Sequence, residues 1–138
     1  MVDEYIKDVC DILDIQPPLV SFDTSKFATD TMQAMCDPSG GVIYIRRKKN
    51  PDADYMLAIA HELRHIWQIT QNPDLLKGYR PINMMESLEA YNLQPAEVDA
   101  NAFAAMVMAD FFHLSPQWQG MSQKVVDAIN ERINILAH

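Results

Sequence analysis

Apolar residues recur at helical spacing in four long segments of the chain. In residues 2–14, 95–112 and 122–136 they return every three or four positions, the pattern of an amphipathic helix with one face on a core. Residues 55–70 contain neither glycine nor proline and show the same spacing. We predict a helix over each segment. The apolar stripe of the helix over residues 55–70 consists of Met56, Ile59, Ala60, Leu63, Ile66 and Trp67.

Shorter apolar runs between the first two predicted helices favour strands. Residues 19–22, 31–36 and 41–47 are candidate strands, and the last two flank an Asp-Pro-Ser-Gly turn sequence at 37–40. We therefore predict a β-hairpin from the second and third strands. Together with the helices, this gives an α+β fold with a small mixed or antiparallel sheet.

Polar residues, glycine and proline mark where these elements begin and end. Residues 52–54, with two aspartates, fit the start of the helix that continues over 55–70, and Asn50 and Pro51 just before them fit a cap and a first-turn residue. Asn72 with Pro73 fits its end. The segment that follows is rich in loop residues as far as position 94, with a short helix near 84–91. A length of 138 residues predicts one domain over residues 1–138, large enough for a core of its own.

The helix predicted over residues 55–70 carries the sequence His61-Glu62-Leu63-Arg64-His65. Histidines four residues apart project from one face of a helix, about one turn from each other, and can bind the same zinc ion. Glu62 is adjacent to the first histidine, so its carboxylate can act as general base on zinc-bound water. The pattern is typical of metal-dependent peptide hydrolysis.

A third ligand must come from another segment. A metzincin would continue with glycine and histidine where this chain has Gln68 and Gln71, so that class is excluded. Gluzincins take a glutamate from a later helix, and Glu97, just after Pro95 at a predicted helix start, is the strongest candidate. Asn101 lies four residues further on the same side, where it could orient Glu97 or a histidine.

Three other acidic residues are weaker candidates for the third ligand. Asp99 points to another side of the same predicted helix and is the second choice. Glu86 and Glu89 lie in a short segment with less helical support, and a solvated acidic turn explains them better. We therefore expect Glu97 to complete the site.

The two motifs together resemble a known family. The stretch at 61–65, followed by Glu-Val-Asp-Ala-Asn-Ala-Phe-Ala-Ala at 97–105, resembles the ImmA/IrrE family of zincin metallopeptidases. That family typically shows an HELxH helix and then a helix close to E-x-E-A-N-x-F-A-A. The resemblance covers roughly residues 40–110, and the small gluzincins called minigluzincins are similar in size and layout. It implies a zincin-like fold, with the sheet packed on the HExxH helix and the glutamate helix.

The resemblance also implies roles for individual residues. His61, His65 and Glu97 would be the ligands of Zn²⁺, and Glu62 would be the base. Two positions depart from the family pattern: Arg64 replaces a small residue and would crowd or recharge the cleft, and Asp99 replaces a second glutamate without disturbing ligation. The chain has no room for the helix-turn-helix or sensor domain of some larger relatives, so a regulatory role on DNA is not implied.

Further residues are candidates for binding the substrate. In zincins a strand before the HExxH helix lies along the cleft, so Val42, Ile43 and Tyr44 are expected to pair with an extended peptide, although an ordinary strand explains them as well. Arg64 is included as a cleft residue. Stabilisation of an oxyanion could come from Tyr79, Arg80 or His113, although a surface loop or helix-end position explains these residues too.

Composition narrows the possible partners. The net charge is −8, which argues against a nucleic-acid-binding surface. The one basic run, residues 46–49, fits a solvated turn, and the alternative is that it binds an acidic segment of the substrate. No apolar run is long enough to span a bilayer, and the acidic N-terminal residues are unlike a secretion signal, so we expect a cytoplasmic protein with no membrane partner. Cys10 and Cys36 form no metal-binding motif and are expected to be small buried side chains.

These observations predict a zinc-dependent endopeptidase of gluzincin type that acts on a protein or peptide substrate. By analogy with ImmA/IrrE proteins, that substrate would be an intracellular protein such as a transcriptional regulator. The alternative is a zincin-fold binding or regulatory protein without proteolysis, in which the metal is structural or absent. A third interpretation is a helical interaction module in which the HExxH pattern is accidental.

Overall fold

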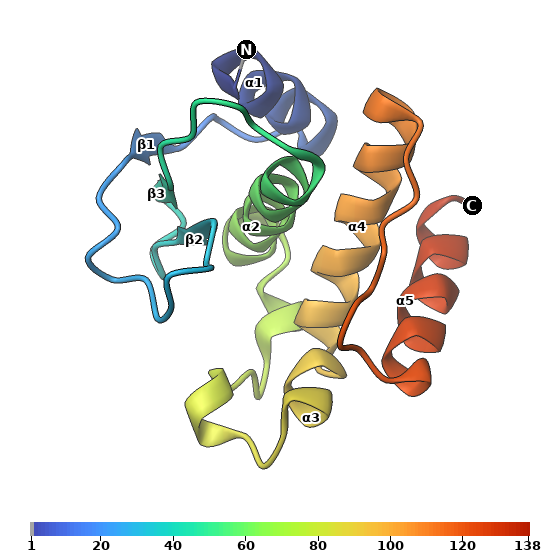
Figure 1. Ribbon diagram of the computed structural model, residues 1–138. Coiled ribbons are helices and arrows are strands. Elements are labelled where there is room, and N and C mark those ends of the chain that lie inside the picture. The colour runs from blue at the N-terminus through green and yellow to red at the C-terminus, as the bar shows by residue number, and fades with distance from the viewer. Residues whose placement is uncertain (1) are drawn as a thin grey trace.

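The structure is a computed structural model that describes residues 2–138. Over these residues the chain forms five α-helices, two short 3-10 helices and one sheet of three strands (Figure 1). In chain order the elements are α1 (Val2–Leu13), β1 (Leu19–Ser21), β2 (Ala34–Cys36), β3 (Val42–Ile45), α2 (Ala53–Gln71), η1 (Pro73–Leu76), η2 (Ile82–Met84), α3 (Leu88–Asn92), α4 (Pro95–Phe112) and α5 (Gln123–Leu136).

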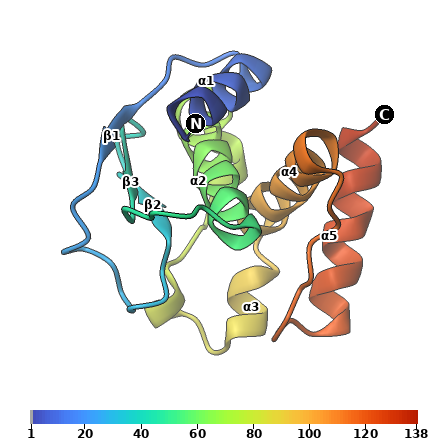
Figure 2. The ribbon, with the colours of Figure 1, turned by 45° about the horizontal axis from the view of Figure 1, so that its top comes forward.

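Helix α2 lies at the centre of the fold, between the sheet on one side and α4 on the other (Figures 1 and 2). Its predicted apolar stripe is buried as expected, except that Trp67 is only partly buried. The helix begins at Ala53, within the predicted start, but its cap is Asp52 and not Asn50: Asp52 accepts a hydrogen bond from the backbone N–H of Tyr55 at 2.9 Å. Asn72 and Pro73 end the helix, as predicted.

The sheet has the strand order β1-β3-β2, with β1 parallel and β2 antiparallel to β3. The predicted hairpin is confirmed as β2 and β3, although both strands are shorter than expected. Its turn requires glycine at position 40, because φ is +77° there and an added Cβ would lie 3.1 Å from side-chain atoms of Ile69 and Thr70 on α2. The hairpin is therefore held tightly against α2.

The expectation that Val42, Ile43 and Tyr44 border the cleft is wrong. Strand β3 is the middle strand of the sheet, and its backbone pairs with β1 on one side and β2 on the other. Ile43 is fully buried in the core, and the Tyr44 hydroxyl is 3.4 Å from Lys26 Nζ at the exposed surface. The edge strand next to α2 is β2.

Small residues allow α2 and α4 to pack closely. Ala96, Ala100 and Ala104 recur every four residues on α4 and are fully buried. Because alanine side chains are short, two helix backbones can approach each other closely along a face that consists of them. This contact brings the middle of α2 beside the first two turns of α4, which is where the candidate ligands lie.

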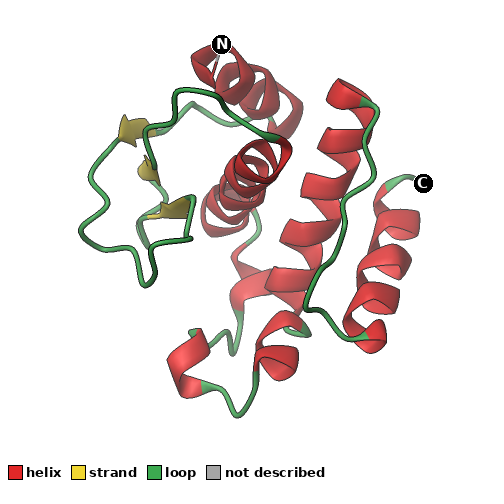
Figure 3. Ribbon diagram, in the orientation of Figure 1, coloured by secondary structure: helices red, strands yellow, loops and turns green. Residues whose placement is uncertain are grey.

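Helix α5 covers the opposite side of α4 and forms a smaller apolar cluster with it. Val125 and Ile129 are its fully buried residues, while three other predicted stripe residues, Val126, Ile133 and Leu136, are only partly buried. The mixed α+β class predicted from the pattern is confirmed (Figure 3). Within residues 2–138, none of the helices combines the length and apolar composition needed to cross a bilayer.

Candidate metal centre

His61 and His65 project from the same side of α2 toward α4. Their Nε2 atoms are 3.1 Å apart, and their ring planes are nearly perpendicular. Both side chains are largely buried, with exposed fractions of 16% and 10%. The one-turn spacing predicted from the sequence therefore aims two imidazole nitrogens at a single point.

Glu97, in the first turn of α4, supplies a carboxylate at the same point. Its Oε1 is 3.3 Å from His61 Nε2, and its Oε2 is 2.8 Å from His65 Nε2. One ligand atom from each of the three residues lies within 4.8 Å of the others, so the group could hold a metal ion. The structure thus brings together the three ligands expected from the sequence.

The outer nitrogen of each ring is occupied by a side-chain amide. His61 Nδ1 is 2.8 Å from Asn101 Oδ1, so Asn101 contacts a candidate ligand as expected, and His65 Nδ1 is 2.8 Å from Gln68 Oε1. Amide oxygens only accept hydrogen bonds, so both Nδ1 atoms must carry hydrogen. The Nε2 atoms are therefore the ones left to bind a cation.

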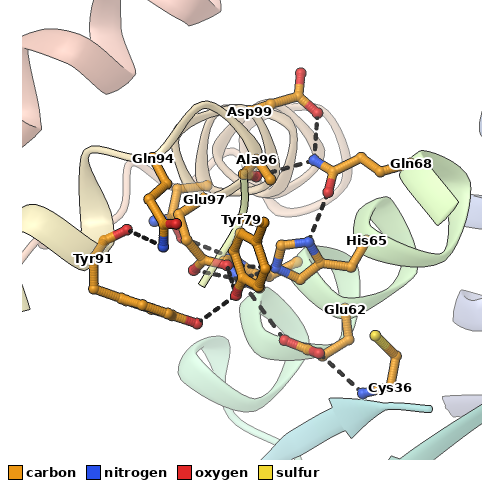
Figure 4. A network of polar contacts seen from close by, with 12 residues as sticks. Cys36, Glu62, His65, Gln68, Tyr79, Tyr91, Gln94, Ala96, Glu97 and Asp99 are labelled. Atoms are coloured by element: carbon orange, nitrogen blue, oxygen red, sulfur yellow. Dashed lines mark hydrogen bonds and ion pairs between the residues drawn. The ribbon is translucent and has the colours of Figure 1, made fainter. Parts of the chain in front are cut away.

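The orientation of the Gln68 amide is fixed by its other contacts. Its Nε2 donates to the carbonyl oxygen of Ala96 at 3.0 Å and to Asp99 Oδ2 at 2.9 Å, as Figure 4 shows. A flipped amide would place an oxygen against these two acceptors. The role of Gln68 was missed in the sequence, although its position three residues after His65 on the same side of the helix is the signal that could have revealed it.

This arrangement requires a positive charge between the rings. With hydrogen on both Nδ1 atoms, two Nε2 lone pairs and the Glu97 carboxylate would face each other without a proton or metal ion. Burial lowers the pKa of His65, but the hydrogen bond that His65 donates to Glu97 and the charges of Glu62 and Glu97 outweigh it and raise the pKa to about 9. Burial raises the pKa of Glu97, but the charge of His61 and hydrogen bonds to both histidines lower it well below its ordinary value.

The donor set and its spacing fit zinc. Two imidazole nitrogens and one carboxylate are ligands that zinc prefers, and bonds of roughly 2.0–2.1 Å imply tetrahedron edges of about 3.3 Å. The two Nε2 atoms are 3.1 Å apart, and His61 Nε2 and His65 Nε2 lie 3.3 and 2.8 Å from Glu97 Oε1 and Oε2 respectively, so each imidazole is within about one such edge of a carboxylate oxygen. The residues therefore fit this ion.

Glu62 lies beside the ligands and is held by the edge strand. Its Oε1 accepts a hydrogen bond from the backbone N–H of Cys36 in β2 at 3.0 Å (Figure 4). Its Oε2 is 3.7 Å from His61 Nε2. One oxygen is thus anchored and the other faces the centre. Cys36 is partly buried, and its backbone contact with Glu62 was not expected from the sequence.

Two tyrosines cover the open side of Glu97. The Tyr79 hydroxyl donates to Glu97 Oε2 at 3.0 Å, so its own oxygen accepts from the Tyr91 hydroxyl at 2.9 Å. Burial and the charge of Glu97 raise the pKa of both phenols above their ordinary value, so each keeps its proton. Tyr79, one of the three oxyanion candidates, does reach the site, where its hydroxyl contacts the candidate ligand Glu97; the part played by Tyr91 was missed.

The expectation that Arg64 enters the cleft is wrong. Its guanidinium is buried against Asp99, with Nε 2.7 Å from Oδ2 and Nη2 3.0 Å from Oδ1, and it stacks on the ring of Trp67. At 100° per residue, position 64 lies about 160° around α2 from Glu62, so the two side chains leave opposite sides of the helix. Asp99 points away from the ligands, as expected.

The remaining candidates lie away from the centre. Arg80 is exposed, and its backbone is bonded to the Gln94 side chain. His113 caps the far end of α4, about 24 Å from Glu97 by the rise of the helix. Glu86 and Glu89 are exposed, but only Glu86 lies in a bend, whereas Glu89 is in the first turn of α3.

A cleft of about 570 Å³ opens beside the candidate ligands. Its floor is formed by Glu62, His65 and Ile69 of α2. Strand β2 forms one wall, and the loop that contains Tyr79 forms the other. The candidate base and one candidate ligand are therefore accessible from the cleft.

Comparison of the chain with protein-family models, with curated proteins and with solved structures finds no match in any of the three. The assignment of function therefore depends on the geometry of the site itself.

Proposed function

We propose that this protein is a zinc-dependent endopeptidase of gluzincin type with a zincin-like fold, similar to the ImmA/IrrE metallopeptidases. One observation carries the proposal: His61, His65 and Glu97, from two helices, converge within 4.8 Å, with Glu62 beside them at the floor of a cleft. A structural zinc site is normally closed by four protein ligands, whereas a hydrolytic site has three and faces open space. The three-residue set at a cleft favours hydrolysis.

The residues divide the work of hydrolysis among themselves. Zinc bound at this centre would polarise the scissile carbonyl and make water acidic enough to react near neutral pH. Glu62 takes the proton of the attacking water through its inward oxygen and passes it to the leaving amine. Asn101 and Gln68 hold the two imidazoles in the tautomer that presents Nε2.

An extended peptide has a place to bind along strand β2. This strand is at the edge of the sheet, and Ala34, Met35 and Cys36 line the cleft. A peptide that adds to a sheet edge is held by its backbone, so its side chains can vary. We propose a protein or peptide substrate on this basis, and a transcriptional regulator by analogy with ImmA/IrrE proteins.

Replacement of the base tests the proposal. Glu62→Gln keeps the size of the side chain and removes its basicity, so we expect hydrolysis of a peptide library by the zinc-loaded protein to fall at least about a hundredfold. Zinc content, measured by elemental analysis, should stay at one ion per chain. Glu86→Gln, at an exposed position, is the matched control and should change neither value.

Two outcomes would contradict the proposal. Purified protein that neither contains nor binds zinc would exclude the metal centre. If the zinc-loaded protein hydrolyses no peptide and Glu62→Gln leaves the biological function of the protein in the cell unchanged, a binding or regulatory protein with this fold would be favoured instead.

A further inference from the structure

The basic run at residues 46–49 begins where strand β3 ends, beside the start of β2. The backbone N–H of Arg46 donates to the carbonyl oxygen of Gln33 at 2.9 Å, which extends the pairing of the two strands by one residue. The Nε of the same arginine donates to the carbonyl oxygen of Met32 at 2.9 Å. Because Met32 lines the cleft, the guanidinium of Arg46 lies next to one end of that cleft.

The guanidinium of Arg46 is held in place without being neutralised. It lies over the ring of Phe27, with Cζ 5.3 Å from the ring centroid. A guanidinium over a ring keeps the N–H groups at its edge available as donors. Within residues 2–138 no carboxylate forms an ion pair with Arg46, and Nε is the one guanidinium nitrogen that has a hydrogen bond. Both Nη groups are therefore left for a ligand.

Two further cations, both exposed, add positive charge near Arg46. Lys26 Nζ lies over the ring of Tyr44, 5.3 Å from its centroid, two residues before Arg46 on β3. Arg47 lies over the ring of Phe22, 4.0 Å from its centroid, and is thus turned toward the β1 side of the sheet. In a chain with a net charge of −8, this surface is an exception that suits an acidic ligand.

The open edge of β2 lies between this surface and the candidate base. The carbonyl oxygen of Gln33 and the backbone N–H of Asp37 are both bonded to the β3 side of the hairpin. Because hydrogen bonds alternate along an antiparallel strand, the backbone groups of Ala34 and Cys36 point away from β3. The N–H of Cys36 donates to Glu62, which leaves the backbone of Ala34 for a bound peptide.

The length of β2 sets the spacing between Glu62 and Arg46. Glu62 is bonded to the backbone of Cys36, and Arg46 is bonded to that of Met32, four residues earlier in the chain. An extended chain advances about 3.3 Å per residue, so these two contacts are about 13 Å apart along the strand. A peptide that pairs with β2 and has its scissile bond beside Glu62 therefore passes Arg46 about four residues from that bond.

From this arrangement we infer that Arg46 determines specificity by binding an aspartate or glutamate about four residues from the scissile bond of an extended peptide. A carboxylate accepts hydrogen bonds from the Nη groups, whereas a lysine or arginine at that position is repelled. The inference rests on the proposed function for the place of the scissile bond. The preference for an acidic residue can be measured by binding alone.

Binding of labelled peptides to the metal-free protein tests the preference without catalysis. The probes are coumarin-labelled ten-residue peptides of threonine and alanine with two glutamates at one end or the other, each with a glutamine counterpart. Fluorescence anisotropy should show one glutamate peptide binding about three- to tenfold more tightly than its counterpart in dilute salt, as a partly exposed guanidinium–carboxylate pair allows. The difference should fall below about twofold in 0.5 M salt. Equal affinities, or no binding of any peptide, would overturn the inference.

Variants and a local signal show whether Arg46 is the place of binding. Arg46→Gln should abolish the preference, and Arg46→Lys should restore part of it, because it returns the charge without the paired donors. Lys124→Gln, at an exposed position on α5, removes the same charge elsewhere and should change nothing. With methionine methyl groups labelled with ¹³C, the glutamate peptide should shift the NMR signal of Met32. If Arg46→Gln keeps the full preference, or if the signal of Met32 stays in place in the unchanged protein, the inference is wrong.

Hydrolysis is measured separately, by digestion of a peptide library with the zinc-loaded protein. Enrichment of acidic residues about four positions from the cleaved bonds, lost in Arg46→Gln, would support both the inference and the proposed function. Cleavage without such enrichment would overturn the role of Arg46 and leave the peptidase in place. An acidic preference in binding without any hydrolysis would count against the peptidase and leave the acidic-peptide site in place.

Discussion

Gln68 is the residue that decides which nitrogen of His65 faces the metal centre. Its amide nitrogen is committed to Ala96 and Asp99, so its oxygen must accept from His65 Nδ1. The amide is fully buried, which leaves no water to replace any of these bonds. A candidate ligand histidine is thus oriented by a residue that is not itself a candidate ligand.

Removal of this amide should weaken zinc binding without removing a ligand. Gln68→Met retains the volume of the side chain but offers His65 no acceptor, and we expect the affinity for zinc to fall about 10- to 100-fold. Competition with a chromogenic chelator measures it. Gln71→Met, three residues later on α2 and exposed, is the matched control. Equal affinities in the two variants would show that Gln68 does not position the ligand.

At this scale the sequence predicted which three side chains converge, and it missed most of the residues that hold them in place. His61, His65 and Glu97 could be named because helix periodicity and gluzincin ligand chemistry need no tertiary information. The contacts of Tyr91 and of the Cys36 backbone depend on how loops and strands meet α2, which no local pattern specifies. Arg64 was wrongly placed in the cleft because it lies between Glu62 and His65 in the sequence. Its angular position around α2 directs its side chain to another side of the helix.

At the scale of elements, Asp99 joins three helices. It lies on α4, receives hydrogen bonds from Arg64 and Gln68 of α2, and receives two more from Arg132 of α5. The carboxylate is fully buried, and these partners lower its pKa against the effect of burial, which raises it. Helix α5 is thereby connected to His65 through Asp99 and Gln68.

Loss of this charge should destabilise the fold. Asp99→Asn leaves two guanidinium groups near a neutral side chain in a buried site, and we expect the free energy of unfolding to fall by about 3–5 kcal/mol. Urea denaturation of the metal-free protein measures the change. Asp110→Asn, at an exposed position on the same helix, should stay within about 0.5 kcal/mol of the unchanged protein. A loss below about 1 kcal/mol for Asp99→Asn would contradict this account.

The helices and the hairpin were predictable because their signals are local. Amphipathic spacing indicated α1, α2, α4 and α5, and the turn sequence at 37–40 indicated the hairpin. The interior place of β3 was not predictable, since it depends on parallel pairing with β1, about twenty residues earlier. Because of that pairing, β3 is the central strand instead of the strand that borders the cleft, and β2 is the edge strand beside the cleft.

For the molecule as a whole, a proton and the proposed zinc ion would compete for the same place between His65 and Glu97. The pKa of His65 in the metal-free fold is about 9, above its ordinary value of 6.5. Its contribution to stability is therefore fully present below about pH 6.5 and is lost as the pH rises through about 9. Zinc binding displaces that proton, so the affinity for zinc should rise over the same interval.

Thermal unfolding at several pH values tests this competition. Between pH 6.5 and 9 the increase in melting temperature produced by a fixed zinc concentration should grow, while the metal-free protein loses stability. His113→Gln, at the exposed far end of α4, is the control and should leave both trends unchanged. A zinc effect that shrinks as the pH rises would show that His65 is not protonated in the metal-free fold.

The contact between Glu62 and the backbone N–H of Cys36 ties the position of the Glu62 carboxylate to the hairpin. If the carboxylate is the base, its reach is set by where β2 lies, and β2 is held in turn by the glycine turn that packs on α2. A peptide that added to β2 would then pull on the same strand that aligns the base. Binding of a peptide at β2 would thus change the position of the Glu62 carboxylate, and with it the ability of that carboxylate to take a proton.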